Sequence, residues 1–298
     1  MKEIKIDLLP LISKLEAVLK RGFSRDLLAG NYKSVFKGKG MEFVGFREYS
    51  PSDDAMLIDW KASLKANEMM VRVLEEERNV TVFFLMDVSD SMLFSSHKKL
   101  KCEFAAELCA TLCFAMHEVG DRVGMAMFND RIVKFIPPAL GKNQFYRIAK
   151  TLSAPENYGG KFDLTFALKY LLNLNFLRKD AIVFVISDFI GMNPSSEEAL
   201  ELAGLKFDLT TIVVRDPVDM RMPIVEGEVR LKDPFSRSQM MINPMDAKLI
   251  YESEAKSQLM KLQKELNKTN SSMLVLETDG EFTGEIFKFF KMRQHWKG

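Results

Sequence analysis

The chain has 298 residues, 47% of them apolar, so it is long enough to bury a large core in one domain or in a domain with an appendage. Its 42 Lys and Arg residues nearly balance 41 Asp and Glu residues, which gives a formal net charge of +1. This balance predicts neither a nucleic-acid partner nor a surface attracted to acidic lipids.

The N-terminal stretch MKEIKIDLLPLISKLEAVLK has charges at both ends of a very short apolar run. This is not the pattern of a signal peptide, and no uncharged stretch approaches the length of a membrane span. Cys102, Cys109 and Cys113 share one face of a predicted helix, as small core residues do, and the three histidines are too scattered for a zinc site. We therefore expect a soluble, cytoplasmic protein.

Residues 1–79 are predicted to form an N-terminal extension, with a short helix followed by a glycine-punctuated, β-rich segment. No low-complexity linker separates this extension from the rest of the chain. We therefore expect it to pack onto the following domain, with Arg47 pairing with an acid and Trp60 buried as an anchor.

From residue 80 onward, short runs rich in Val, Ile and Phe alternate with amphipathic segments. Continuously apolar strands separated by helices are typical of a parallel sheet covered on both faces. The sequence thus predicts an α/β domain over residues 80–298, a doubly wound, mostly parallel sheet of the Rossmann type. Strands are expected at 80–87, 122–129, 131–138, 181–188, 209–216 and 271–278, and helices at 98–120, 142–153, 163–174, 195–203, 246–268 and 281–293.

Two segments depart from this alternation. The strands at 122–129 and 131–138 are joined so closely that they predict a hairpin, with one antiparallel strand at the sheet edge. Residues 217–245 carry alternating polar and apolar stretches around Asp233-Pro234, which predict a β-hairpin inserted on the domain surface.

Oxygen-bearing side chains follow two of the predicted strands. Asp87 ends the most apolar strand, Ser89 and Ser91 follow at every second position, and Asp188 ends the strand at 181–188. Ligands of doubly wound sheets bind outside the carboxyl ends of the strands, and this hard-oxygen set suits Mg²⁺, Mn²⁺ or Ca²⁺. The alternative is a turn whose Ser and Asp side chains only cap a helix.

This D-x-S-x-S arrangement resembles the metal-ion-dependent adhesion site of von Willebrand factor A domains. The resemblance implies that the two serines ligate the ion directly, the acids bind mostly through water, and a threonine completes the set. A carboxylate of a partner protein then fills the open position. Phe162 stands at the usual threonine position in GGKFDL (159–164), so we name Thr165 as the substitute and expect weak ion binding.

A second resemblance covers nearly the whole chain. The stretches GKGMEF (38–43), REYSPSDDAMLIDW (47–60), MVRVLEEER (70–78), GDRVGMAMF (120–128) and ISDF (186–189) occur in an order similar to that of the domain of unknown function family 58 (DUF58). That family implies a von Willebrand factor A-like domain and a MoxR-type AAA+ ATPase as protein partner, in a chaperone-like role in assembly or maturation.

We therefore expect a non-enzymatic module that binds protein through a divalent ion. One alternative is a phosphatase or phosphotransferase of the haloacid dehalogenase type, with Asp87 as nucleophile beside Mg²⁺. That chemistry needs a second acid two residues later, where this chain has Ser89, and Asp90 points the other way along an extended stretch. The remaining alternative is a scaffold with a vestigial metal site.

Overall fold

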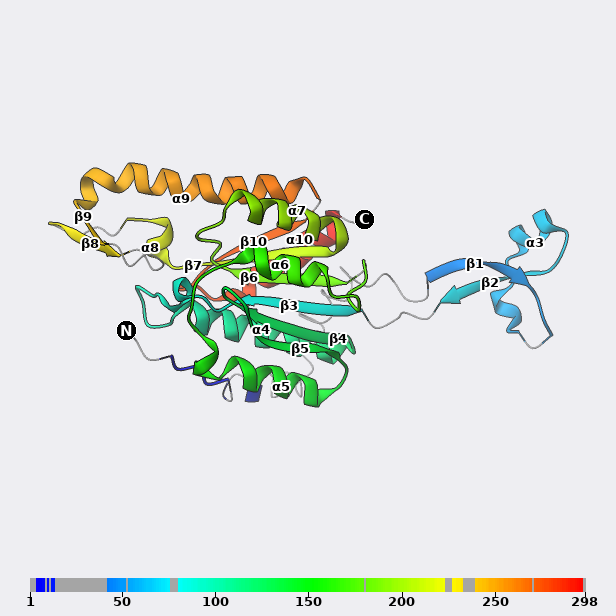
Figure 1. Ribbon diagram of the computed structural model, residues 1–298. Helices are drawn as coiled ribbons and strands as arrows, with labels where there is room; N and C mark the ends of the chain where they lie inside the picture. Colours follow the sequence, from blue (N-terminus) through cyan, green and yellow to red (C-terminus); the bar gives the residue numbers. More distant parts are fainter. Residues whose placement is uncertain are drawn as a thin grey trace.

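A computed structural model describes residues 4–8, 10, 12–13, 42–51, 53–75, 80–179, 181–222, 227–232, 239–269 and 271–296. Its main sheet has six strands in the order β10-β7-β6-β3-β4-β5 (Figure 1). The strands are β3 (Thr81–Asp87), β4 (Arg122–Phe128), β5 (Ile132–Ala139), β6 (Ile182–Ser187), β7 (Asp208–Arg215) and β10 (Ser272–Glu277).

The order of these strands confirms the doubly wound α/β class. From β5 across to β10, the domain's strands appear in the order third, second, first, fourth, fifth, sixth, as in dinucleotide-binding folds. All neighbours are parallel except β4 and β5, which form the antiparallel hairpin expected at the edge. The strand order therefore reverses between β3 and β6, which are parallel neighbours.

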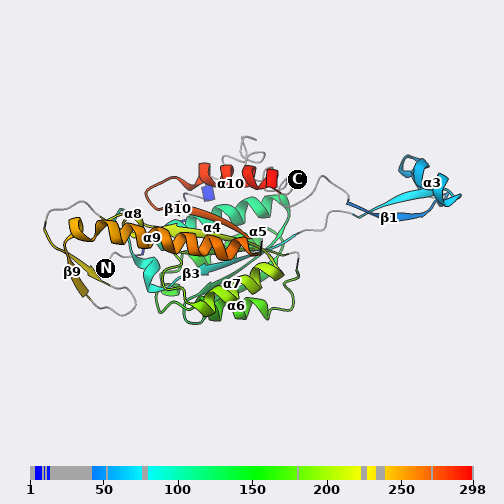
Figure 2. The same cartoon turned by 90° about the horizontal axis from the view of Figure 1, so that it is seen from above.

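Helices cover both faces of the sheet (Figure 2). One face carries α4 (Lys101–Val119), α5 (Lys142–Leu152) and α10 (Phe282–Trp296), and the other carries α6 (Leu164–Leu172), α7 (Pro194–Lys206) and α9 (Pro244–Asn267). All six predicted helices of the domain are thus confirmed. None of the helices in the described parts of the chain combines the length and apolar character needed to cross a membrane.

Residues 82–86 of the central strand β3 are all apolar, because both faces of the strand are buried. Val82, Phe84 and Met86 pack into the core beneath α4, α5 and α10, whereas Phe83 and Leu85 pack into the core beneath α6, α7 and α9. Successive side chains of a strand point to opposite faces, so an unbroken apolar run fills two cores at once. Each such side chain contributes about 1.5–3 kcal/mol through burial.

The three cysteines are core residues of α4, as predicted. Cys102, Cys109 and Cys113 are all buried and free. Burial, the largest cause, raises the pKa of the Cys102 thiol to about 12, with the nearby Glu103 charge adding to the shift. A thiol with so high a pKa stays protonated and unreactive at neutral pH.

The predicted insertion is an antiparallel hairpin preceded by a short helix. It contains α8 (Pro217–Met220), β8 (Val229–Lys232) and β9 (Gln239–Ile242), with Val229 opposite Ile242. The expected turn at Asp233-Pro234 lies outside the described residues. Figure 1 places this hairpin beside the first turns of α9, at the end of the sheet toward which β3 runs.

The β-rich extension forms an arm that projects away from the sheet in Figures 1 and 2. Its antiparallel strands β1 (Glu42–Glu48) and β2 (Met70–Glu75) flank η2 (Ala55–Leu57) and α3 (Trp60–Ala66). Arg47 pairs with Asp53 through two hydrogen bonds of 2.6 and 2.5 Å, which confirms the expected ion pair.

The expected burial of Trp60 is wrong, because its residue surface is 67% exposed. Asp59 caps α3 by accepting hydrogen bonds from the amides of Lys61 and Ala62, so Trp60 begins a helix that stands out with the arm. The arm has almost no core of its own. Among its described residues, Val71 is the one buried apolar side chain. The expectation that this part of the extension packs onto the sheet domain is therefore also wrong.

The first residues of the chain do pack onto the domain. Ile6, Leu8 and Ile12 lie in the same core as α4, and the Lys5 amide donates a 2.7 Å hydrogen bond to Glu103 Oε1. The helix predicted in this region is described only at residues 10, 12 and 13, and the rest of it lies outside the described residues. The first residues of the extension thus pack onto the domain, whereas the arm projects away from it.

We expect Leu8→Ala to lower the free energy of unfolding by about 2–5 kcal/mol, because it leaves a cavity beside α4. Leu8 is 2% exposed, whereas Leu64 on α3 is 85% exposed and provides a matched control. Leu64→Ala should change the stability by no more than about 0.5 kcal/mol. Urea denaturation of both variants measures the difference, and equal midpoints would contradict the packing of the N-terminal segment.

Candidate metal centre

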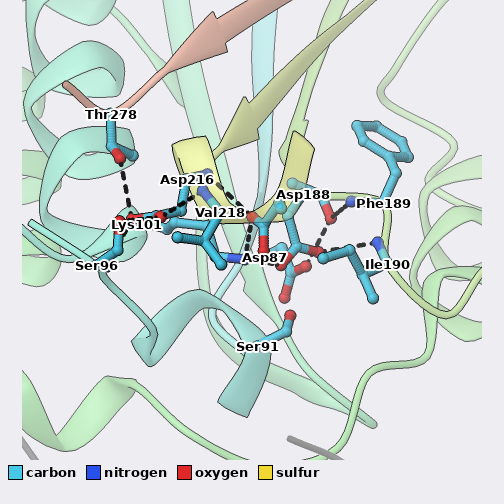
Figure 3. A network of polar contacts seen from close by, with 12 residues as sticks. Asp87, Ser91, Ser96, Lys101, Asp188, Phe189, Ile190, Asp216, Val218 and Thr278 are labelled. Atoms are coloured by element: carbon cyan, nitrogen blue, oxygen red, sulfur yellow. Dashed lines mark hydrogen bonds and ion pairs between the residues drawn. The ribbon is translucent and has the colours of Figure 1, made fainter. Parts of the chain in front are cut away.

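Four of the five predicted ligands, all except Thr165, lie where β3 and β6 end, at the point where the strand order reverses (Figure 3). Asp87 is the last residue of β3, and Asp188 directly follows β6. Because the two strands are parallel neighbours, their carboxyl ends meet at the same edge of the sheet. The fold therefore brings together side chains that are about a hundred residues apart in sequence.

Asp87 is fully buried, and both of its carboxylate oxygens accept hydrogen bonds. Oδ1 accepts from the Ser89 amide at 2.8 Å, and Oδ2 accepts from Ser187 Oγ at 2.6 Å. The hydroxyl oxygens of Ser89 and Ser91 lie 3.2 Å apart, and both side chains are buried. The three residues of the D-x-S-x-S motif thus converge on one point.

Asp188 contributes a second buried carboxylate. Its Oδ1 accepts a 2.9 Å hydrogen bond from the Ile190 amide. Burial raises the pKa of Asp87 to about 7, and the nearby Asp188 charge is the second cause of the rise. Phe189, the next residue, has φ of 54°, which is uncommon for a large side chain and marks a sharp turn at the end of β6.

Lys101 joins this group, although the sequence reasoning did not select it. Its Nζ lies 2.7 Å from Asp188 Oδ2 and 2.9 Å from Asp219 Oδ2. Burial lowers the pKa of Lys101, but the charges of Asp188 and Asp219 outweigh burial and raise it above the ordinary value.

A signal for Lys101 was present in the sequence. Lys101 stands at the head of the apolar stripe formed by Ala105, Leu108 and Leu112, at helical spacing, and all four are buried. A lysine in line with such a stripe is directed into the core, where it needs a partner of opposite charge.

The short helix α8 brings Asp219 to the lysine. Asp216 caps this helix through the Val218 amide at 3.0 Å and also accepts hydrogen bonds from the Ser96 amide and hydroxyl. The Asp216 amide in turn donates to Asp219 Oδ2 at 2.9 Å. These contacts hold the loop before α4 against the end of β7.

Carboxylates outnumber basic groups around these strand ends, which favours a cation there. The acids are Asp87, Asp188, Asp216 and Asp219, and the buried basic residues are Lys101 and Arg215.

The loop that carries the serines is held by a second loop. The Gly159 amide donates to the Val88 carbonyl at 2.7 Å, and Asp90 Oδ1 accepts from the Gly160 amide at 2.8 Å. Gly160 has φ of 105°, and a Cβ at this position would lie 2.5 Å from Asn129 Nδ2. Glycine is therefore required here for both backbone conformation and space.

Thr165 makes its side-chain hydrogen bond outside this cluster. Its hydroxyl lies 3.1 Å from Ser196 Oγ, near the start of α7, and no hydrogen bond to Asp87, Ser89, Ser91 or Asp188 is found among the described contacts. Phe162, at the usual threonine position, is half-buried and packs on Phe128 in the core beneath α6 and α7. The structure brings four of the five predicted ligands together.

The donor set of the site is therefore two hydroxyls and two carboxylates, which are the hard oxygen ligands that Mg²⁺, Mn²⁺ and Ca²⁺ prefer. Both acids have protein donors on their carboxylates, which leaves them suited to hold an ion through water. Within the described residues, no group of three or more His, Cys, Asp and Glu side chains is placed to hold a metal ion.

Comparison with known proteins identifies a family. The family model described as "Protein of unknown function DUF58" matches residues 45–260. Uncharacterized proteins of Mycobacterium tuberculosis and Mycobacterium bovis are 24% identical to this chain over 278 residues, covering 90% of this chain and 84% of theirs.

Solved structures overlap this fold in part. The conserved hypothetical protein BatB from Bacteroides thetaiotaomicron is 14% identical, with a TM-score of 0.48, and the match covers 73% of this chain and 100% of BatB. The manganese-loaded TRAP protein of Plasmodium vivax is 18% identical, with a TM-score of 0.32, and the match covers 45% of this chain and 57% of TRAP.

We expect Gly160→Ala to destabilise the protein more than Gly141→Ala, by about 1–3 kcal/mol, because only the first adds a clash. Both glycines have positive φ, but a Cβ on Gly141 has no atom within 4 Å. Chemical denaturation measures the difference. Equal losses in the two variants would mean that the loop carrying the serines moves aside at no cost.

The stability of the metal-free protein is expected to fall as the pH rises from about 4 to about 7, because of Asp87. The pKa of this carboxyl is about 7 in the folded protein and about 3.9 when unfolded, so only the folded state holds its proton in this window. The free energy of unfolding then decreases by up to about 1.4 kcal/mol per pH unit.

Asp87→Asn should remove this component of the pH dependence. Urea denaturation in EDTA at about pH 5, 6 and 8 measures the slopes of both proteins. Parallel profiles for the variant and the wild type would show that Asp87 ionises normally in the fold.

Proposed function

The chain belongs to the DUF58 family of proteins of unknown function, and from that premise we propose that it is a non-enzymatic, cytoplasmic protein-binding module. In this proposal a divalent ion, Mg²⁺ or Mn²⁺, binds at Asp87, Ser89, Ser91 and Asp188. The ion leaves one coordination position for a carboxylate of the partner. Membership of the family carries no activity with it, so the proposal depends on the site.

The convergence of the two serine hydroxyls beside Asp87 is the observation that carries the proposal. Ser89 Oγ and Ser91 Oγ lie 3.2 Å apart, while the Ser89 amide is held by Asp87 Oδ1. A turn used only for capping would direct these hydroxyls at free main-chain amides of the following helix. In this chain Ser89 precedes η3 (Asp90–Leu93) without a side-chain capping bond.

The proposed chemistry is recognition without turnover. When bound, the ion supplies a Lewis-acidic position that accepts a carboxylate oxygen. Ser89 and Ser91 would hold the ion directly, and Asp87 and Asp188 would hold its water ligands. A phosphatase of the haloacid dehalogenase type is disfavoured, because its general acid would stand at position 89, where the chain has a buried serine.

The partner we propose is a MoxR-type AAA+ ATPase, with the pair acting in assembly or maturation of other proteins. The basis for this partner is the family resemblance of the sequence. In this proposal the ATPase contributes the acidic side chain that fills the open position of the ion.

Ser89→Ala is expected to weaken Mg²⁺ or Mn²⁺ binding by at least about tenfold, because it removes one direct ligand without adding bulk. Isothermal titration calorimetry measures the affinity. Ser95→Ala is the matched control in the same loop, since Ser95 is half-buried and bonds only to His97 among the contacts described. Equal affinities in the two variants would contradict the proposed ligand set.

Binding of the purified ATPase should follow ion occupancy. EDTA also strips Mg²⁺ from a nucleotide-loaded ATPase, so EDTA alone is ambiguous. Ser89→Ala leaves the ATPase supplied with Mg²⁺ and is expected to lose capture, whereas Ser95→Ala retains it. Capture that persists with Ser89→Ala would favour a scaffold that binds through ordinary surfaces.

A further inference from the structure

Lys101 places a cation of the protein's own on a carboxylate of the proposed metal site. It is the first residue of α4 and is 1% exposed, and its ammonium lies 2.7 Å from Asp188 Oδ2 (Figure 3). A second carboxylate, that of Asp219, receives it at 2.9 Å. Asp188 therefore belongs to the proposed metal site at the end of β6 and also pairs with Lys101 at the start of α4.

Helix propensity does not explain a lysine at this position. The first turn of a helix has a partial positive charge, so a cation there is unfavourable, and a 19-residue helix is long enough for a full macrodipole. Burial adds a further cost, because an ammonium loses its water. The two carboxylates are what offset both costs, which makes the ammonium part of the acidic cluster.

A metal ion at the serines would compete with this ammonium. An ion that also draws on Asp188 comes close to Lys101 Nζ, and like charges in a buried site repel strongly. Asp188 would have to turn toward such an ion, and Lys101 would then keep Asp219 as its counter-ion. Asp219 is held for this purpose by the Asp216 amide at 2.9 Å.

We infer that Lys101 lowers the divalent-ion affinity of this site. Its ammonium pairs with Asp188, so a metal ion has to compete with it for that carboxylate. This inference rests on the proposed ion site. Lys101 is a positioning residue in this scheme, because it acts through Asp188 and does not ligate the ion. It also provides a metal-free state in which Asp188 is neutralised by the chain itself.

Lys101→Met tests the inference, because methionine has similar length and no charge. We expect it to bind Mn²⁺ at least about tenfold more tightly than the wild type by calorimetry. Lys99→Met is the matched control, since Lys99 lies two residues earlier and pairs with Glu107 at 2.7 Å, away from the site acids. Its affinity for Mn²⁺ should equal that of the wild type.

Thermal unfolding provides a readout independent of any partner. In EDTA, Lys101→Met should melt below the wild type, because Asp188 and Asp219 lose their counter-ion, and Mn²⁺ should restore its Tm by more than it shifts the wild type. Lys101→Gln keeps a hydrogen-bond donor without the charge and serves as a second variant if Lys101→Met does not fold in EDTA. It should show the same gain in affinity.

The outcomes separate this inference from the proposed function. If the wild type binds Mn²⁺ and the Lys101 variants bind no more tightly, the inference is overturned and the ion site stands. If the variants bind Mn²⁺ but the wild type does not, the inference is supported and an ion bridge in the native protein is ruled out. If none of the proteins binds Mn²⁺ and no Tm responds to it, both are overturned.

Discussion

The contact of the Lys101 ammonium with two carboxylates connects three parts of the fold that are far apart in sequence. It joins the start of α4 to the end of β6 through Asp188 and to α8 through Asp219. A charge left alone in the interior costs several kcal/mol, so these elements must keep their mutual positions. The position of Asp188 depends on that arrangement, and the charge of Asp188 adds to the burial that raises the pKa of Asp87.

The same contact places a cation of the protein's own beside the oxygen-lined site at the switch point. Hydroxyls and carboxylates converge at the ends of β3 and β6, as they do in sites for hard cations. Here a lysine from a neighbouring helix already neutralises part of the negative charge. In the proposed site, occupancy would be a balance between the Lys101 ammonium, which is fixed to the chain, and a metal ion, which can dissociate.

Much of the fold was predictable because local patterns agree with the global arrangement. The unbroken apolar run of β3 predicted a strand buried on both faces, and the short connection between residues 122–129 and 131–138 predicted the antiparallel edge hairpin. The predicted carboxyl ends of β3 and β6 placed Asp87 and Asp188 at the same edge of the sheet. Trp60 was misplaced because a large aromatic residue predicts burial on average, whereas its neighbours decide whether there is anything to pack against.

The sequence by itself determined the doubly wound class, the strand ends that carry the site, and the convergence of Asp87 with two serines, because these depend on periodicity and on the parallel arrangement of the strands. Only the tertiary structure decided which charges meet. Lys101, Asp188 and Asp219 come from three elements, and Thr165 faces Ser196 on α7. Side-chain pairing between distant segments follows from helix rotation and loop path, which no local pattern specifies.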